Sequence, residues 1–155
     1  MYIVKDSVHI NAPIERVFRL STNIELVRQT LRMRPVAGRT SGMVVEGDTV
    51  EWRGWKFGLP QKHTSVISGY EAPAFFQDTQ LQGRFAQFQH DHHLEWVDGY
   101  TLAYDKVKFS LPLGVLGKFV ARTIMVPHIT GLLAQRFALL KRLAEGDEWQ
   151  RYVPE

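Results

Sequence analysis

Apolar and polar residues alternate along several short segments, which is the pattern of strands with one buried face. In the first segment, 2–10, valine and isoleucine residues recur at even positions, so they are expected on one face of the strand. Turns such as Gly58-Leu59-Pro60 and Asp98-Gly99 separate the later segments. A change of parity at Gly54 predicts a β-bulge at that position. We predict one N-terminal strand and six further strands: 36–42, 48–57, 62–68, 75–80, 84–96 and 101–109.

Two short helices are predicted between the first and second strands. Asn11-Ala12-Pro13 places a proline in the first turn of a helix, and apolar residues then recur at near-helical spacing to Leu20. Thr22-Asn23-Ile24-Glu25 fits a capping box. A second helix is therefore expected to start there and to run to about Leu31.

A long helix is predicted from the turn at 112–114 to about Glu145, with a kink at Pro127. Its apolar positions form one stripe: Ile129, Leu132, Leu133, Phe137, Leu140 and Leu143. An antiparallel sheet with one apolar face needs a cover, and only this helix is long enough to provide it. We therefore expect an α+β fold in which a curved antiparallel sheet of about seven strands wraps around the helix. Residues 1–155 are expected to form one domain.

Short phrases along nearly the whole chain carry a resemblance to a known superfamily. They are Ile10-Asn11-Ala12-Pro13 with Val17-Phe18, Gly83-Arg84-Phe85 before Phe88-Gln89-His90, Gly99-Tyr100-Thr101 with Asp105, Leu111-Pro112-Leu113-Gly114, and Arg136-Phe137 with Leu140. Together with the order of the elements, they resemble the START-like, or SRPBCC, superfamily, which includes birch-pollen-allergen-like proteins and polyketide cyclases/dehydrases. The resemblance implies a helix-grip fold with a ligand cavity between sheet and helix. The resemblance is informative for the fold and much less so for function, because one fold hosts many functions. It supplies no family-wide catalytic motif.

Composition and charge narrow the possible partners. The net charge is +3, and apolar residues interrupt the arginines between positions 28 and 39, so we expect a solvated face and no nucleic-acid partner. The chain has no cysteine, which excludes disulfides, thiolate nucleophiles and cysteine zinc sites. The N-terminus does not have the pattern of a signal peptide. Segment 111–133 contains Lys118, Arg122 and Pro127 and is a poor membrane span. We expect a cytoplasmic protein.

The sequence His90-Asp91-His92-His93 is the most conspicuous candidate for chemistry. His90 and His92 share a parity with apolar neighbours, so both imidazoles should point inward while Asp91 and His93 point outward. Two such imidazoles can bind a metal if a third ligand joins them, and Asp105 is a candidate. Because no third nitrogen ligand is evident, we predict hydrogen bonds among these groups at a cavity wall, with no metal and no cofactor.

Arg136 lies inside the apolar stripe of the long helix. A buried guanidinium needs a partner, and we expect an acid on the sheet, Asp105 or Asp78, ahead of an anionic ligand. The inward polar residues and the apolar residues of the inner faces form the predicted ligand-binding set: His90, His92, Asp105, Arg136, Trp52, Phe76, Phe88, Phe109, Leu132 and Leu133.

The leading prediction for function is binding of an apolar or aromatic small molecule, lipid-like or polyketide-like. The resemblance also suggests an enzyme of the polyketide cyclase/dehydratase kind, in which an inward histidine acts as general acid or base; we assign it no catalytic residues. A third alternative is a coenzyme Q-type lipid carrier that contacts a membrane through residues 111–119, with Lys118 and Arg122 near anionic headgroups. The sequence leaves the ligand, the occurrence of turnover and the oligomeric state open.

Overall fold

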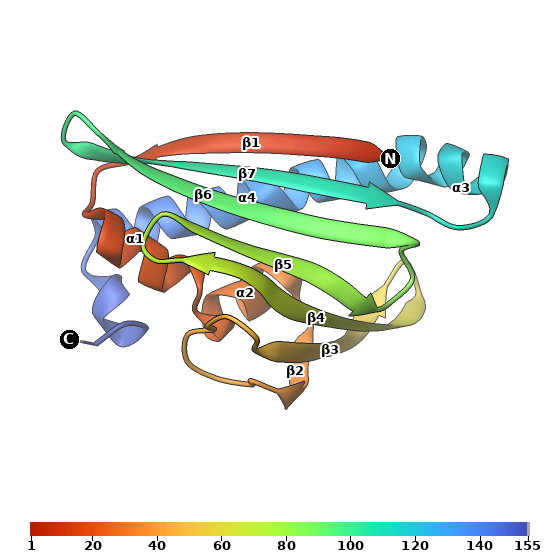
Figure 1. Ribbon diagram of the computed structural model, residues 1–155, viewed down its shortest axis with the longest axis horizontal. Coiled ribbons are helices and arrows are strands. Elements are labelled where there is room, and N and C mark those ends of the chain that lie inside the picture. The colour runs from red at the N-terminus through yellow and green to blue at the C-terminus, as the bar shows by residue number, and fades with distance from the viewer. Residues whose placement is uncertain (155) are drawn as a thin grey trace.

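Seven strands form one antiparallel sheet in the computed structural model, which describes residues 1–154. In chain order they are β1 (Tyr2–Ile10), β2 (Arg34–Gly38), β3 (Thr49–Lys56), β4 (Leu59–Glu71), β5 (Phe75–Gln82), β6 (Gln87–Val97) and β7 (Tyr100–Ser110). Their order across the sheet is β1-β7-β6-β5-β4-β3-β2. Strands β2 to β7 thus follow one another as a meander, and the last strand, β7, pairs with the first, β1 (Figure 1). The predicted α+β class and sheet are confirmed.

Two short helices, α1 (Ile14–Ser21) and α2 (Ile24–Leu31), follow β1 as predicted. The residue that caps α2 is Asn23, whose side chain accepts a hydrogen bond of 2.9 Å from the backbone N–H of Glu25. Thr22, the first residue of the predicted capping box, instead ends α1, and its hydroxyl donates to carbonyl oxygens in the last turn of that helix. The prediction was therefore wrong by one residue: the capping box placed the N-cap of α2 at Thr22, and the N-cap is Asn23.

The predicted bulge at Gly54 is also wrong. Strand β3 pairs with β4 through Gly54, which lies opposite Gln61 without a shift of register. A Cβ at this position would lie 2.9 Å from Cγ of Met33, so glycine is required by close packing of the neighbouring chain. The parity change arises because Trp55 is an exposed aromatic residue on the outer face.

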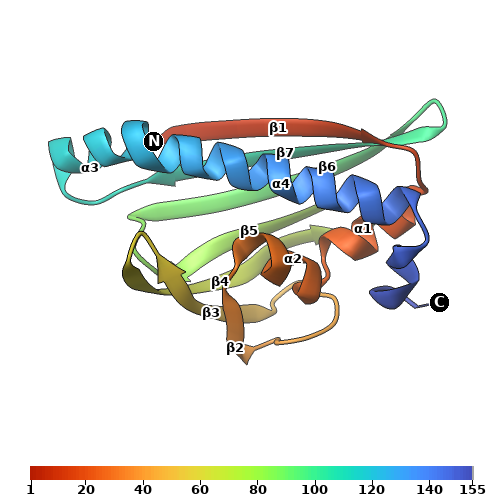
Figure 2. The ribbon, with the colours of Figure 1, turned by 180° about the vertical axis from the view of Figure 1, so that it is seen from behind.

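The C-terminal helical region runs without a break from Gly114 to Glu145 and crosses the inner face of the sheet (Figure 2). It consists of α3 (Gly114–Val120), a π-helical turn (Ala121–Met125) and α4 (Val126–Glu145). The π-helical turn ends at Met125, two residues before Pro127, which lacks the N–H that a regular helix needs. The kink predicted at this proline stays a prediction, and the structure shows a π-helical turn just before it.

One stripe of α4 is buried: Ile129, Leu133, Phe137, Leu140 and Leu143. The first two pack with Val4, Val107 and Phe109 on the sheet. The last three pack with residues of α1 and of the opposite end of the sheet. Residues 114–145 are long and apolar enough to cross a membrane by length and composition alone. Because the stripe forms the core of the fold, we treat this helix as a core helix.

Leu140 gives a direct test of the stripe, because it is 1% exposed and lies within the core cluster. We expect Leu140→Ala to lower the free energy of unfolding by about 2–5 kcal/mol, through lost burial and the cavity that remains. The matched control is Leu116→Ala on α3, where the side chain is 59% exposed and the expected change is about 0.5 kcal/mol or less. Urea unfolding followed by circular dichroism measures both, and equal effects would contradict the proposed packing.

Candidate functional site

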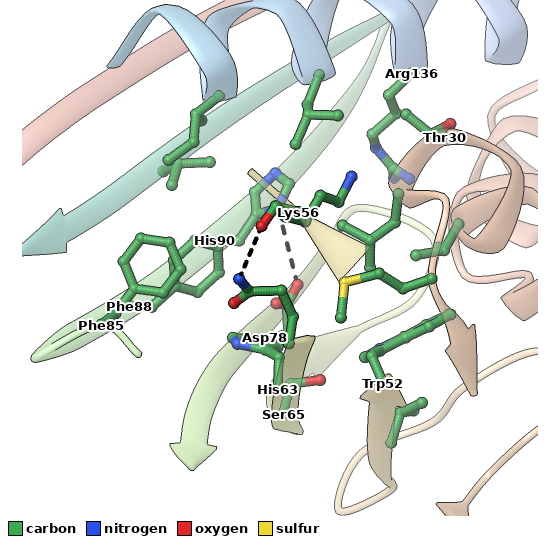
Figure 3. Close-up of a pocket in the computed structure, with 18 of the residues that line it drawn as sticks. Thr30, Trp52, Lys56, His63, Ser65, Asp78, Phe85, Phe88, His90 and Arg136 are labelled. Carbon is green, nitrogen blue, oxygen red and sulfur yellow. Dashed lines mark hydrogen bonds and ion pairs between the residues drawn. The ribbon is translucent and has the colours of Figure 1, made fainter. Parts of the chain in front are cut away.

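A cavity of about 400 Å³ lies between the inner face of the sheet and the helices. Helix α4 contributes Ile129, Leu132 and Leu133 to its wall, and the sheet contributes Trp52 and Phe76. Figure 3 shows Arg136 reaching in from α4, while His90 and Asp78 enter from the sheet. The cavity is therefore an apolar space with a small polar region on its wall.

Most of the predicted ligand-binding residues line this cavity: His90, His92, Arg136, Trp52, Phe76, Phe88, Leu132 and Leu133. Two others do not. Phe109 is 0% exposed, because Tyr2 and Phe85 pack against its ring with centroids 5.6 and 5.7 Å away. Asp105 lies in the polar cluster but is not one of the lining residues. Phe109 is therefore a core residue, and Asp105 lies behind the residues of the cavity wall, so neither forms part of that wall.

Strand register brings the polar side chains together. His92 of β6 lies opposite Phe76 of β5 and opposite Asp105 of β7. His90, two residues earlier, lies opposite Asp78 of β5. Directly opposed residues in an antiparallel pair point to the same face. Both imidazoles and both carboxylates therefore meet on the inner face of three adjacent strands.

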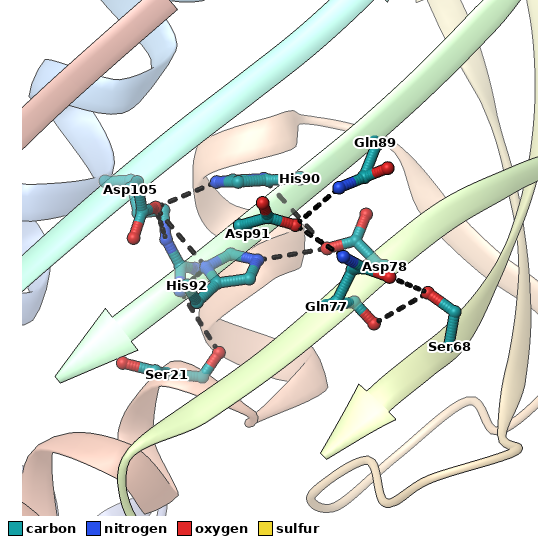
Figure 4. Close-up of polar contacts among 10 residues, drawn as sticks. Ser21, Ser68, Gln77, Asp78, Gln89, His90, Asp91, His92 and Asp105 are labelled. Carbon is teal, nitrogen blue, oxygen red and sulfur yellow. Dashed lines mark hydrogen bonds and ion pairs between the residues drawn. The ribbon is translucent and has the colours of Figure 1, made fainter. Parts of the chain in front are cut away.

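Asp105 is the centre of this cluster, and its side chain is only 3% exposed. Its Oδ2 lies 2.9 Å from Nε2 of His90 and 3.3 Å from Nδ1 of His92 (Figure 4). Burial would raise the pKa of Asp105, but the charges and hydrogen bonds of His92 and His90 hold that pKa well below its usual range. Asp105 is therefore an ionised carboxylate inside the protein.

Arg136 supplies a positive charge to the same carboxylate. Its Nε lies 3.4 Å from Oδ2 of Asp105, and its Nη2 donates to the backbone carbonyl of Ser21 at 3.3 Å. This is one of the two acid partners predicted from the sequence. The carbonyl of Ser21 carried no sequence signal, because only the packing of the α1–α2 corner against α4 brings it to the guanidinium.

The two imidazoles differ in charge because their surroundings differ. Burial would lower the pKa of His92, but the carboxylates of Asp105 and Asp78 raise it above its ordinary value. Its ring stacks on Phe76, with centroids 3.9 Å apart and planes at 6°. Burial, and then the charge of His92, lower the pKa of His90 despite the neighbouring carboxylates. The pKa of His92 is thus raised and that of His90 is lowered, so His92 takes up a proton at a higher pH than His90 does.

These charges balance. When His92 is protonated, it and Arg136 carry two positive charges, and Asp78 and Asp105 carry two negative charges. A cluster with no net charge is the least costly way to place four ionised groups in a poorly solvated wall. His90, the fifth member, is held by Asp105 and stays neutral, so it can exchange a proton or a hydrogen bond with a molecule in the cavity.

The sequence pattern indicated Asp78 only as a partner of Arg136, and Asp78 is absent from the predicted ligand-binding set. In the structure its Oδ2 lies 3.0 Å from Nε2 of His92 and 4.0 Å from Nδ1 of His90, and its side chain is 21% exposed. Burial would raise its pKa, but the hydrogen bond from His92 and the nearby imidazole charges lower it. Parity with Phe76 in the predicted strand 75–80 was the signal that could have identified it.

His63 of β4 is a further cavity-lining imidazole, which is absent from the predicted ligand-binding set. Burial lowers its pKa, although the charge of Asp78 works in the opposite direction. The rings of Phe85 and Phe88 meet it edge-on, with centroids 6.3 and 5.5 Å away. An isolated histidine in a strand gives no sequence signal of this kind, because only the packing of β4 against the β5–β6 turn creates the site.

Solved structures with the same fold are numerous. A START superfamily protein from Mycobacterium smegmatis superimposes with a TM-score of 0.67 at 14% identity, over 91% of this chain and 98% of that one. Ara h 8.0201 gives a TM-score of 0.64 at 14% identity, over 92% and 97% of the two chains. The KanY protein gives 0.71 at 13% identity, over 94% and 98%. The chain therefore has the START-like, or SRPBCC, helix-grip fold. No protein-family model matches the sequence, and no curated protein matches it either.

The raised pKa of His92 predicts a pH dependence of stability. Between its unfolded pKa of about 6.5 and its higher folded pKa, the folded protein binds more protons than the unfolded chain, so stability falls as pH rises, by up to about 1.4 kcal/mol per pH unit. His90, with its lowered pKa, acts in the opposite sense below about pH 6.5.

We expect His92→Phe to remove the decline above about pH 6.5, while the variant ring keeps its stack on Phe76. Urea unfolding of both proteins between about pH 6.5 and 8.5, in buffer with a chelator, measures the difference in slope. Since other titrating groups are common to both proteins, a difference in stability that does not change with pH would contradict the assignment of charge to His92.

Proposed function

We propose that the protein binds an apolar or aromatic small molecule, lipid-like or polyketide-like, in the cavity between the sheet and α4. The observation that carries this proposal is a mostly apolar cavity of about 400 Å³ with one compact polar cluster on its wall. Sites for small molecules are commonly concave and apolar, with a few placed polar groups that fix orientation. The START-like fold of the chain supports the same class of function.

The polar cluster sets a requirement on that molecule. His90, His92 and Arg136 all line the cavity, and each is also held by Asp105. A ligand with an oxygen-bearing group beside them can accept a hydrogen bond from Arg136 or donate one to Nδ1 of His90, and both groups are already oriented, so little ordering is needed on binding. We therefore propose a molecule with an apolar body and one polar oxygen-bearing end.

A second candidate, a carrier that takes a lipid-like molecule from a membrane, is favoured by the exposed surface at one end of the fold. Helix α3 and the β3–β4 turn lie at the same end in both views (Figures 1 and 2). That end exposes seven large apolar side chains: Trp55, Phe57, Leu59, Leu113, Val115, Leu116 and Phe119. Phe57 and Leu59 also line the cavity, so the apolar surface is continuous with the cavity wall.

The charges of that end suit an anionic bilayer. Lys56, Lys118 and Arg122 lie among the apolar side chains, and segments 52–70 and 106–144 contain no acidic residue. Basic side chains beside apolar ones are the combination that binds membrane interfaces, since the apolar groups enter the lipid while the cations meet headgroups. We propose this surface, the α3 end, as the membrane contact of such a carrier.

Leu132→Trp tests the cavity as a binding site. The added ring should occupy part of the cavity and weaken binding of the apolar dye 1-anilinonaphthalene-8-sulfonate roughly tenfold, or about 1.4 kcal/mol. Ala134→Trp, on the exposed face of the same helix, is the control and should leave dye affinity unchanged. Fluorescence titration measures both. If the two variants bind dye as the wild type does, the dye adsorbs elsewhere and the cavity proposal fails.

The membrane contact is tested by sedimentation with vesicles of phosphatidylcholine containing phosphatidylglycerol. Leu116→Ser combined with Phe119→Ser should weaken binding by about tenfold or more, because two apolar side chains no longer enter the lipid. Trp96→Ser, an exposed aromatic residue of β6 near the β6–β7 turn, is the control and should bind as the wild type does. Failure of the wild-type protein to sediment with these vesicles would exclude the carrier alternative.

A further inference from the structure

The imidazoles of His90 and His92 both lie between the same two carboxylates, with one ring nitrogen toward Asp105 and the other toward Asp78. Asp105 takes one nitrogen of each ring, Nε2 of His90 at 2.9 Å and Nδ1 of His92 at 3.3 Å. The second nitrogen of each ring faces Asp78 on the other side, at 4.0 and 3.0 Å from its Oδ2 (Figure 4). One ligand atom from each of Asp78, His90 and His92 lies within 4.8 Å of the other two.

We propose that Asp78, His90 and His92 bind a divalent transition-metal ion of the Zn²⁺ class, through the Asp78 carboxylate, Nδ1 of His90 and Nε2 of His92. Ligand atoms about 2.0–2.2 Å from such an ion stand roughly 3 to 3.6 Å from one another. The distances of 3.0 and 4.0 Å from Asp78 bracket this range, so small side-chain rotations bring the three atoms to one ion. The third ligand is thus Asp78, whereas the sequence had pointed to Asp105.

Asp105 occupies the place of an outer-shell carboxylate. Histidine ligands of metals usually donate their other N–H to a carboxylate or carbonyl, which fixes the tautomer and directs the remaining lone pair at the ion. The buried Asp105 carboxylate does this for His90, with a hydrogen bond of 2.9 Å to Nε2. Nδ1 of His92 lies 3.3 Å from the same carboxylate oxygen and 3.3 Å from Nη2 of Arg136, whose Nε lies 3.4 Å from Asp105. Asp105 is therefore a positioning residue for the metal, because it orients both rings; His92 releases its proton when the ion binds.

The open side of this site faces the cavity. All three proposed ligands line the cavity, whose other walls are largely apolar. Three protein ligands leave at least one coordination position for water or another molecule, as in sites where metals act on substrates. With both imidazoles neutral, the ion and Arg136 outweigh the two carboxylates by one positive charge. The open position therefore favours an anionic oxygen, such as a carboxylate or an enolate on an otherwise apolar molecule.

Metal binding is measured on the untagged protein after treatment with a chelator, by calorimetric titration with Zn²⁺ and by visible absorption with Co²⁺. We expect one Zn²⁺ per chain and Co²⁺ bands of the intensity typical of four or five ligands. Asp78→Asn, His90→Gln and His92→Gln should each lower Zn²⁺ affinity by more than about 100-fold, and Asp105→Asn by about 10–100-fold. His93→Gln, one residue away on the outer face, is the matched control and should bind as the wild type does.

Circular dichroism establishes that each variant is folded, and the three ligand variants test the site even where Asp105→Asn does not fold. Absence of saturable Zn²⁺ binding by the wild type, or equal affinity in Asp78→Asn, overturns the proposal. Zn²⁺ binding does not require an apolar ligand, and dye binding does not require the metal. The failure of this site is therefore distinguishable from failure of the proposed cavity function.

Discussion

The candidate site depends on one buried carboxylate, that of Asp105. Its Oδ2 lies within 3.4 Å of nitrogen atoms from His90, His92 and Arg136, which belong to β6 and α4. It thereby links the sheet to the helix that covers it and fixes which nitrogen of each ring faces the cavity. Breaking a buried ion pair by removing one partner costs about 3–5 kcal/mol, because an uncompensated charge is left inside. Asp105, the residue that orders the site, therefore does not itself line the cavity.

The cluster and the core share residues, so binding and stability are coupled in this fold. Phe76 packs edge-on against Phe18 of α1 in the core and also stacks on His92. Arg136 belongs to the buried stripe of α4, yet it also supports Asp105. Groups positioned by strands and a packed helix lose little freedom when a ligand or an ion binds. The same packing means that a substitution in the cluster changes both properties, so the control His93→Gln lies on the outer face of the strand that carries His90 and His92.

The wall of the cavity is polar at one end and apolar at the other. Toward the α1–α2 corner the wall carries the ionised cluster, where Arg136 donates to Ser21. Toward the β3–β4 turn it carries Phe57 and Leu59, which continue onto an exposed apolar and basic surface. Phe57 also meets His128 of α4, with ring centroids 5.0 Å apart. A molecule with an apolar body and an oxygen-bearing end matches this gradient, with the polar end at the cluster and the apolar body toward the α3 end.

The sequence by itself determined the elements, the inner face and the presence of a buried polar set. Strand period 2 places His90 and His92 on one face, and helix period 3.6 places Arg136 within the apolar stripe; both periods are local properties of the backbone. It did not determine which acid each imidazole meets, that Phe109 is covered, or that Met33 requires glycine at position 54. Those facts follow from the register between strands and the height at which α4 crosses the sheet. Only the packing of the whole chain sets these quantities, because each joins residues far apart in sequence whose separate patterns are compatible with several pairings.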